Sequence, residues 1–396
     1  MPRAAPRRMR MWRKLAACGT RGKLQRSFAK WRHPMGLNVA VLANLKKNAP
    51  HYDGMPADAW DDLDSDITID AIAAALASRG HRATFLEGNL SLVETLPRLK
   101  PDICFNICEG HWGDSREAHV PAILEMLRIP YTASGVLTLA LTLDKPMTKR
   151  VLHFHGLPTP AFQVFERPDE PPDPDLTFPL FVKPSREGTG MGVSGKSIVN
   201  SAAELRDRLA EQIGRYRQPI LVERFIRGRE VTVGVVGNLT GPVAWRVPEN
   251  EQAARVFQGL RFLPPLEVDF AAYPESEAGV YTNRMKTEWA HNFRYLCPAP
   301  LDPKLAQQLN WLTAAVFRVT GCVDVARVDF RLDADDGDKP YILEVNPLPG
   351  LYPGLSDLVL EADAAGIPYD ELINAIFDAA CARHGLSALD TPVHSG

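Results

Sequence analysis

Two short segments near the C-terminal end, residues 326–332 and 341–347, constrain the fold of this chain more than any other feature. Each alternates apolar and polar residues, which is the period of a half-buried β-strand. The residues between them, 333–340, are rich in Asp and contain Gly and Pro, which favours a turn. The sequence therefore predicts an antiparallel hairpin.

Three oxygen-bearing side chains are expected to gather on this hairpin. Asp329 lies on the first arm, Glu344 lies on the second, and Asn346 follows on the same face as Glu344. Two carboxylates and a carboxamide oxygen that face one point suit Mg²⁺ that is also ligated by phosphate. A solvated hairpin with charged edges is the alternative interpretation.

A glycine-rich segment, residues 178–193, suggests a second kind of site. It reads FPLFVKPSREGTGMGV, an apolar strand that leads to Lys183 and then a loop with three glycines. Glycines allow successive backbone N–H groups to converge on an anion, and the lysine adds a positive charge. A phosphate-binding loop and a magnesium hairpin in one chain imply a nucleotide between them.

Five segments of the chain together resemble the ATP-grasp enzymes, in particular the D-alanine–D-alanine ligases. In chain order they read IPYTASGVLTLALTLDKPMTKRVLHFHGLPTP, VKPSREGTGMGVS, ILVERFIRGREVTV, ARVDFRLD and YILEVNPLPGL, and the resemblance covers residues 37–385. It implies an α/β (α+β) chain with the ATP-grasp fold, preceded by a Rossmann-like N-terminal domain. The implied boundaries are a basic N-terminal extension at 1–35, a substrate domain at 36–134, a central ATP-grasp subdomain at 135–224 and a C-terminal subdomain at 225–388.

The resemblance also implies a reaction. An ATP-dependent carboxylate–amine ligase joins an amino acid to an amine through an acyl phosphate and releases ADP and phosphate. Such an enzyme uses ATP and Mg²⁺, and its partners are two small molecules, a carboxylate and an amine. Phosphoryl transfer needs alignment and charge neutralisation rather than a protein nucleophile.

The family's functional positions can be carried over residue by residue. The implied metal ligands are Asp329, Glu344 and Asn346. The implied nucleotide-binding residues are Lys145, Lys183, Glu187, Gly188, Gly190, Glu223, Phe225, Ile226 and Glu230. The implied catalytic residues are Arg327, Lys286 and Thr189, and the implied substrate-binding residues are Asp64, Glu109, Gly350 and Ser356.

The chain departs from the D-alanine–D-alanine ligases where their substrates bind. Glu109 stands where that family has a histidine, and Thr287 stands where it has a tyrosine. Asp64, in a long acidic loop, is the nearest match to the glutamate that holds the first amino group. Ser356 matches only after a shift of one residue. We therefore expect different substrates, with D-alanine–D-alanine ligase itself as the alternative.

A second nucleotide motif in the sequence competes with this interpretation. Residues 190–197, GMGVSGKS, fit the P-loop expression G-x-x-x-x-G-K-[ST], as in a P-loop kinase. A P-loop opens a helix at its Lys-Ser pair, whereas residues 196–199 are expected to continue as a strand. The helix-start signal comes later, at Ser201 with Glu204 three residues on. We therefore interpret the match as accidental.

A βαβ rhythm and several further helices complete the predicted secondary structure. Strands are expected at 37–43, 82–86, 102–106, 129–131, 219–223 and 231–236, and helices at 67–78, 117–127, 137–153, 303–321 and 369–384. Residues 247–292 lack a regular pattern and include Lys286, so a lid over the site is expected there.

The first 35 residues differ in charge from the rest of the chain. They carry eleven Arg or Lys and no acid, which leaves a net charge of −14 on the remaining residues. This segment is interpreted in three ways: as an arm that binds nucleic acid or a membrane surface, as a transit peptide, or as a dispensable extension. We prefer the dispensable extension.

The rest of the composition is that of an ordinary globular protein. No apolar run approaches the ~20 residues that span a bilayer. The six scattered cysteines suit a reducing cytoplasm. We expect a cytoplasmic enzyme with no nucleic-acid or membrane partner, and a homodimer is one option for its assembly.

Overall fold

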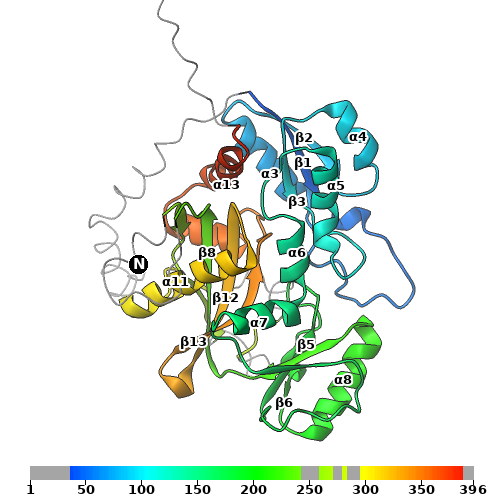
Figure 1. Cartoon of the computed structure of the whole chain (residues 1–396), viewed down its shortest axis with the longest axis vertical. Helices are drawn as coiled ribbons and strands as arrows, with labels where there is room; N and C mark the ends of the chain where they lie inside the picture. Colours follow the sequence, from blue (N-terminus) through cyan, green and yellow to red (C-terminus); the bar gives the residue numbers. More distant parts are fainter. Residues whose placement is uncertain (1–35, 242–257, 271–278, 283–294, 387–396) are drawn as a thin grey trace, which may run out of the picture.

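The computed structural model describes residues 36–241, 258–270, 279–282 and 295–386. Three β-sheets follow one another along the chain, and helices pack on each of them (Figure 1). The domain boundaries expected from the sequence remain a prediction.

The N-terminal sheet is parallel, with strand order β2-β1-β3. Its strands are β1 (Asn38–Ala43), β2 (Arg82–Glu87) and β3 (Ile103–Ile107). On one face of this sheet, helix α3 (Asp66–Ala77) shares a core with α12 (Asp357–Ala364) and α13 (Tyr369–Arg383). On the other face of the sheet pack α4 (Leu92–Leu99) and α5 (His119–Leu127). The loops after β1 and β3 leave the same edge of the sheet, which is where ligands bind in such sheets.

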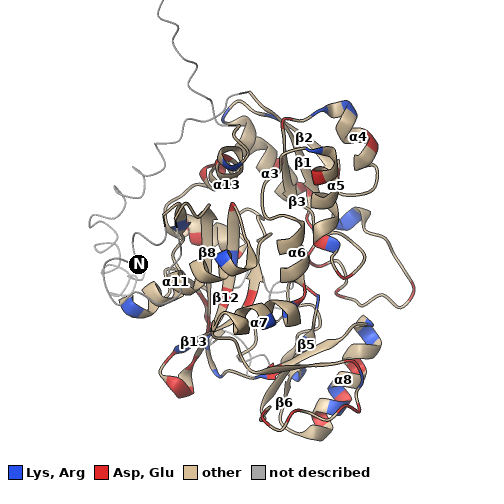
Figure 2. Cartoon of the chain, in the orientation of Figure 1, with Lys and Arg blue, Asp and Glu red and all other residues tan. Residues whose placement is uncertain are grey.

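The second sheet is antiparallel, with strand order β4-β7-β5-β6. Its strands are β4 (Phe162–Phe165), β5 (Leu180–Pro184), β6 (Ile198–Val199) and β7 (Ile220–Arg224). Helix α8 (Ala202–Tyr216) covers it and begins as predicted, because the Ser201 side chain accepts a hydrogen bond from the Glu204 N–H at 3.3 Å. The exposed side of α8 carries both signs of charge (Figure 2).

The third sheet has the order β11-β10-β8-β12-β13, and β9 pairs with β8. Its strands are β8 (Gly228–Gly237), β9 (Leu260–Phe262), β10 (Leu266–Val268), β11 (Tyr295–Leu296), β12 (Val325–Asp333) and β13 (Lys339–Asn346). The predicted hairpin is confirmed, since β12 and β13 pair antiparallel. Its tip, η7 (Ala334–Asp336), is acidic (Figure 2).

Alternation along β12 decides which face of this sheet is buried. Ala326, Val328, Phe330 and Leu332 are buried and share a core with helix α11 (Pro303–Thr320). Each large apolar side chain buried in this way stabilises the fold by about 1.5–3 kcal/mol. The intervening polar residues must then lie on the opposite face.

The structure corrects the predicted helix at 137–153. It is two helices, α6 (Val136–Leu143) and α7 (Lys145–Phe154), separated at Asp144. Asp144 has an extended backbone, and its side chain accepts a hydrogen bond from the Met147 N–H as the N-cap of α7. Pro146 suits the first turn of α7 because it has no N–H to satisfy there.

Three smaller expectations were also wrong. The segment at 129–131 makes only an isolated bridge, Cys104 to Tyr131, because it pairs with β3 at one residue. The run at 196–199 begins as a 3₁₀ turn, η3 (Gly195–Ser197), in which Ser194 and Ser197 cap each other, so only β6 is strand. Helices α4 and α12 had not been predicted; Pro97 inside α4 hides the helical pattern.

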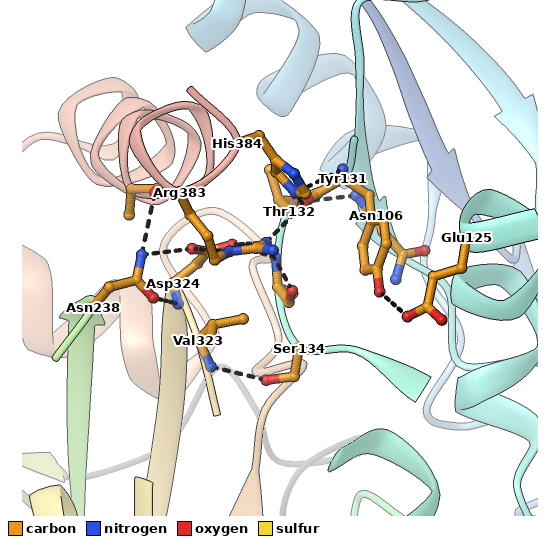
Figure 3. A network of polar contacts seen from close by, with 12 residues as sticks. Asn106, Glu125, Tyr131, Thr132, Ser134, Asn238, Val323, Asp324, Arg383 and His384 are labelled. Carbon is orange, nitrogen blue, oxygen red and sulfur yellow. Dashed lines mark hydrogen bonds and ion pairs between the residues drawn. The ribbon is translucent and has the colours of Figure 1, made fainter. Parts of the chain in front are cut away.

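A polar network around Asp324 joins the N-terminal sheet to the third sheet (Figure 3). The Asp324 side chain is fully buried and accepts hydrogen bonds from the Ala133 N–H at 3.0 Å, from Asn238 at 2.8 Å and from Arg383 at 2.7 Å. These partners come from the segment between α5 and α6, from the residue that follows β8 and from the end of α13. One carboxylate therefore fixes three segments that are far apart in the chain.

In the part of the chain that the structure describes, no helix is long and apolar enough to cross a membrane.

Candidate active site

The polar residues of β12 bring the predicted metal ligands together. Strand register places Asp329 opposite Glu344 on β13 and opposite Thr232 on β8. Arg327 precedes Asp329 by two residues and so lies on the same face. A β-bulge directly after Asp329 ends this pairing register, so the alignment is local to the site.

The Asp329 carboxylate is held from several directions. Arg327 donates to it from Nε at 2.8 Å and from Nη2 at 3.0 Å, Thr232 donates at 2.7 Å, and Asn346 Nδ2 donates at 3.0 Å. Glu344 pairs with Lys145, whose Nζ lies 2.8 Å from Oε1. The sequence prediction that Asp329, Glu344 and Asn346 converge is consistent with these contacts.

The donor set fits a hard divalent cation. Burial acts to raise the pKa of Glu344, but the ammonium groups of Lys145 and Lys183 outweigh burial and hold this pKa below its ordinary value. The carboxylate therefore stays ionised, as a metal ligand must. Among the described residues no group of three His, Cys, Asp or Glu side chains is placed to hold a metal. A cation here would therefore need phosphate or water oxygens besides the protein ligands.

Two lysines share one buried carboxylate behind this site. Lys149 Nζ lies 2.7 Å from Glu223 Oε2, and Lys183 Nζ lies 2.8 Å from Oε1. Burial acts to raise the pKa of Glu223, but the two ammonium groups outweigh it and lower the pKa to about 2. The cluster carries one net positive charge at neutral pH, which favours an anion next to it.

A cavity of about 90 Å³, called here the second cavity, opens beside this cluster. Phe181 and Phe225 stack in one wall with ring centroids 6.2 Å apart, and the Arg331 guanidinium lies 5.5 Å from the Phe225 ring. Glu230 pairs with Arg331 at 2.9 Å. The cavity is lined by Phe181, Lys183, Gly190, Val193, Glu223, Phe225, Ile226, Glu230, Val280, Tyr281, Asp329, Arg331, Leu343 and Glu344.

Part of the glycine-rich loop is hydrogen-bonded to another loop of the protein. The Gly192 N–H donates to Asp58 of the long acidic loop at 2.8 Å, and Tyr216 also donates to that carboxylate. Gly192 has a φ of +75°, and an added Cβ would lie 2.7 Å from the Pro184 ring, so only glycine fits. The N–H of Gly192 is therefore already bonded and is not part of an open phosphate cradle.

A larger cavity of about 380 Å³, called here the first cavity, meets the second cavity at Glu344 and Tyr281. Its walls come from the loops after β1 and β3, from α6 and α7, from the glycine-rich loop and from the segment after β13. The sequence-predicted residues in its lining are Asp64, Glu109, Lys145, Glu187, Gly188, Thr189, Arg327, Glu344, Asn346, Gly350 and Ser356.

Comparison with known proteins decides the family. The family model described as "D-ala D-ala ligase C-terminus" matches residues 151–258 and 267–378. The D-alanine–D-alanine ligase of Syntrophotalea carbinolica is 34% identical over 313 residues, which is 79% of this chain and 90% of that protein. The chain belongs to the D-alanine–D-alanine ligase family.

Other relatives agree with this membership. The uncharacterized protein y4sG of Sinorhizobium fredii is 36% identical over 323 residues, or 80% of this chain and 88% of that protein. The crystal structure of D-alanine–D-alanine ligase from Bacillus anthracis complexed with ATP matches with a TM-score of 0.64 at 22% identity, and covers 89% of this chain and 100% of that one. The predicted α/β (α+β) ATP-grasp fold is thereby confirmed, and the chain is an ATP-dependent carboxylate–amine ligase.

In this family member one end of the first cavity is crowded with carboxylates. Burial, together with the negative charge of Asp62, raises the pKa of Asp64 to about 7. Burial also raises the pKa of Glu109 well above its ordinary value, and Glu117 raises it further. Glu117 itself has a raised pKa, first because of burial and then because of Asp62.

The structure shows what several of the other predicted residues contact. The Glu187 side chain lines the first cavity, not the second, and pairs with Arg116 at 3.3 Å. The Glu223 carboxylate points at the two lysines. Ser356 accepts a hydrogen bond from the Tyr352 N–H at 2.9 Å, and an added Cβ at Gly350 would meet Ser356 Oγ at 2.8 Å. Lys286 lies outside the described residues.

Sequence reasoning missed three residues that line or support the site. Lys149 follows Lys145 by four residues, so their shared helix face was a readable signal. Glu117 was assigned only to a helix start, yet it lines the first cavity. Tyr281, whose hydroxyl lies 2.7 Å from that of Tyr295, falls in the patternless segment and had no sequence signal.

Proposed function

We propose that this ligase binds ATP in the second cavity and its carboxylate and amine substrates in the first. The observation that carries the proposal is the junction of the two cavities at Glu344, beside Asp329 and Lys145. A phosphate that enters this junction from one side would meet a carboxylate that enters from the other. Such placement of two reactants is a major part of the catalysis of a phosphoryl transfer.

The second cavity has the groups that ATP needs. The Phe181 and Phe225 rings give an adenine ring apolar walls, and the backbone from Glu223 to Ile226 lies along the cavity to bond its edge. Glu230 would accept from the ribose hydroxyls. Lys183 and Lys145 would neutralise the phosphates, with Gly188 and Gly190 beside them. The crystal structure of the Bacillus anthracis ligase with ATP supports this choice of nucleotide.

Asp329, Glu344 and Asn346 would hold Mg²⁺. When bound, the cation supplies positive charge to the transferred phosphoryl group and helps to align it. Arg327 keeps Asp329 in place through two hydrogen bonds, and its guanidinium also lines the first cavity. It is therefore available to an oxyanion that develops there.

The reaction has two balanced steps. A carboxylate oxygen of the first substrate attacks the γ-phosphorus, and the bond to ADP breaks, which gives an acyl phosphate and ADP. The neutral amine of the second substrate then attacks the acyl carbon. Phosphate leaves with its electron pair, the amine loses a proton, and an amide remains. Thr189 and Lys286 are proposed to assist at the transferred phosphate.

Phosphate release tests this proposal. Purified protein with ATP and Mg²⁺ is supplied with amino acids singly and in pairs, and phosphate and amide product are measured together. We expect release that requires both Mg²⁺ and an amino acid. Release that no amino acid stimulates, from protein that binds ATP, would contradict the proposal.

D-alanine–D-alanine ligase itself is the second candidate. The names of the curated relatives, among them that of Syntrophotalea carbinolica, favour it. D-alanine as the fastest substrate in the panel would select it. A cytoplasmic location and a homodimer also remain predictions, and the basic arm at 1–35 lies outside the described residues.

A further inference from the structure

The positive side chains that line the first cavity are already paired. The three that the structure describes there form ion pairs as follows: Lys46 with Asp61, Lys145 with Glu344, and Arg327 with Asp329 and Asp357. Arg116, next to the cavity, pairs with Asp62 at 3.0 Å and with Glu187 at 3.3 Å. The cavity therefore holds no spare positive charge among its described residues.

Three carboxylates of the same cavity have no such partner. Asp64, Glu109 and Glu117 form no ion pair with any described residue, and no described group donates a hydrogen bond to the carboxylate of Glu109 or Glu117 (described ranges 36–241, 258–270, 279–282 and 295–386). All three belong to the loops that follow β1 and β3, so they form one end of the cavity. Burial raises the pKa of each, and a neighbouring carboxylate raises it further: Asp62 for Asp64 and Glu117, and Glu117 for Glu109. Arg116 acts to lower the pKa of Glu109 and Glu117 but does not outweigh these effects.

A separate observation also points to a ligand at this end. The side chain of Asp62 is only 5% exposed, and its Oδ1 accepts no hydrogen bond from the described residues, although Oδ2 is paired with Arg116. The buried hydroxyl of Ser65, which lines the same wall, also has no described partner. Buried oxygen atoms without donors are costly, so a bound molecule rich in N–H donors would stabilise this wall.

We infer that the amino-acid substrate at this end of the first cavity carries a second cationic group besides its α-ammonium, as in ornithine or 2,4-diaminobutyrate. The raised pKa values of Asp64, Glu109 and Glu117 mean that these carboxyl groups tend to keep their protons on their own. One ammonium can pair with only one of them in ionised form, whereas a second ammonium allows another to ionise beside a positive charge. This inference rests on the proposed function, because it names the substrate class of the same cavity.

Isosteric pairs of amino acids test the inference. Ornithine is compared with norleucine and 2,4-diaminobutyrate with norvaline, so that the two members of a pair differ by an ammonium in place of a methyl group. Both enantiomers are supplied with ATP and Mg²⁺, each with a panel of second amino acids. We expect kcat/KM for phosphate release to favour the cationic member by roughly tenfold or more, the worth of one charge-assisted hydrogen bond.

Variants then locate the preference. Glu109→Gln and Glu117→Gln keep the side-chain size and remove one negative charge each, so the cationic-to-neutral ratio should fall by roughly tenfold in either variant. Glu94→Gln, on the exposed face of α4, is the matched control and should leave the ratio unchanged. Thermal melts confirm that the variants are folded.

The outcomes separate the two claims. A wild-type protein that turns over norleucine, norvaline or alanine faster than the diamino acids is a ligase but overturns the inference. A cationic preference that survives both Glu→Gln changes also overturns it, because the three carboxylates would not be its source. If no amino acid stimulates phosphate release, the proposed function itself fails.

Discussion

Lys149 and Glu223 form an ion pair, 2.7 Å from Nζ to Oε2, in which both side chains are almost completely buried. Lys183 shares the same carboxylate, and Lys149 also donates to Thr159, which in turn bonds the Ile342 carbonyl on β13. The pair therefore connects α7, the second sheet and the third sheet at the floor of the second cavity.

Glu223→Gln should destabilise the protein far more than Lys149→Met. The first change leaves two buried ammonium groups without a carboxylate, which costs about 3–5 kcal/mol. The second leaves Glu223 paired with Lys183 and removes the excess charge. Chemical denaturation measures both free energies of unfolding. Equal losses would mean that the carboxylate is not what holds the cluster together.

Lys183→Ala should weaken ATP binding by roughly tenfold or more, since a charge-assisted contact is lost. The fold should survive because Glu223 keeps Lys149 as its partner. Lys196→Ala is the matched control: Lys196 is exposed in η3, and its P-loop match is interpreted as accidental. Isothermal titration with ATP distinguishes the two, and a defect confined to Lys196→Ala would support the P-loop kinase instead.

Asp329→Asn and Glu344→Gln should each lower turnover by about 100-fold or more, since even partners of metal ligands commonly cost 10–100-fold. Each variant removes a negative charge from the proposed cation site and keeps the side-chain size. Mn²⁺ binding, followed by electron paramagnetic resonance in the presence of ATP, gives a readout independent of activity. Wild-type turnover by either variant at limiting Mg²⁺ would remove the residue from the metal site.

The local pattern of the sequence was sufficient for the hairpin and for most helices, because periodicity and turn residues determine both. It also predicted that Asp329 and Glu344 project toward one point, and the strand register places them opposite each other. The break at Asp144 was missed because an apolar helical run hides a side chain that caps the next helix. The contact between Asp58 and Gly192 was beyond reach, because it joins two loops that only the packed fold brings together.

The direction of side chains was equally hard to predict. Glu223 lies at the end of a strand, and nothing in the sequence shows that two lysines from other elements enclose it. The surplus of carboxylates in the first cavity depends on which acids already have partners. Which acids have partners can be seen only in the structure, since Lys46, Arg116 and Arg327 could each have paired with other carboxylates.

Asp324→Asn should cost about 3–5 kcal/mol of stability, because it removes the charge that pairs with Arg383 at 2.7 Å in a fully buried position. The network of Figure 3 would then hold an unpaired guanidinium. Asp335→Asn, which breaks the exposed pair with Arg227, is the control and should cost less than about 1 kcal/mol. Urea denaturation compares them; a small loss for Asp324→Asn would show that Asn238 and Ala133 suffice to hold the segments.

Glu117→Gln should raise the melting temperature of the unliganded protein, and by more at pH 8 than at pH 5. The folded-state pKa of Glu117 is raised by burial and by Asp62, so the unfolded chain releases this proton at lower pH than the folded one. The contribution of the carboxyl to stability is therefore complete below the unfolded value of about 4.3 and is lost as pH rises through the raised folded value. Glutamine has no proton to lose, so the variant avoids this loss of stability.

We expect a difference of a few degrees in melting temperature at pH 8, measured by scanning calorimetry against Glu94→Gln. An equal shift at both pH values would show that Glu117 is not strained by the neighbouring carboxylates, whereas the expected slope identifies a site whose charge is kept for its ligand at the expense of stability.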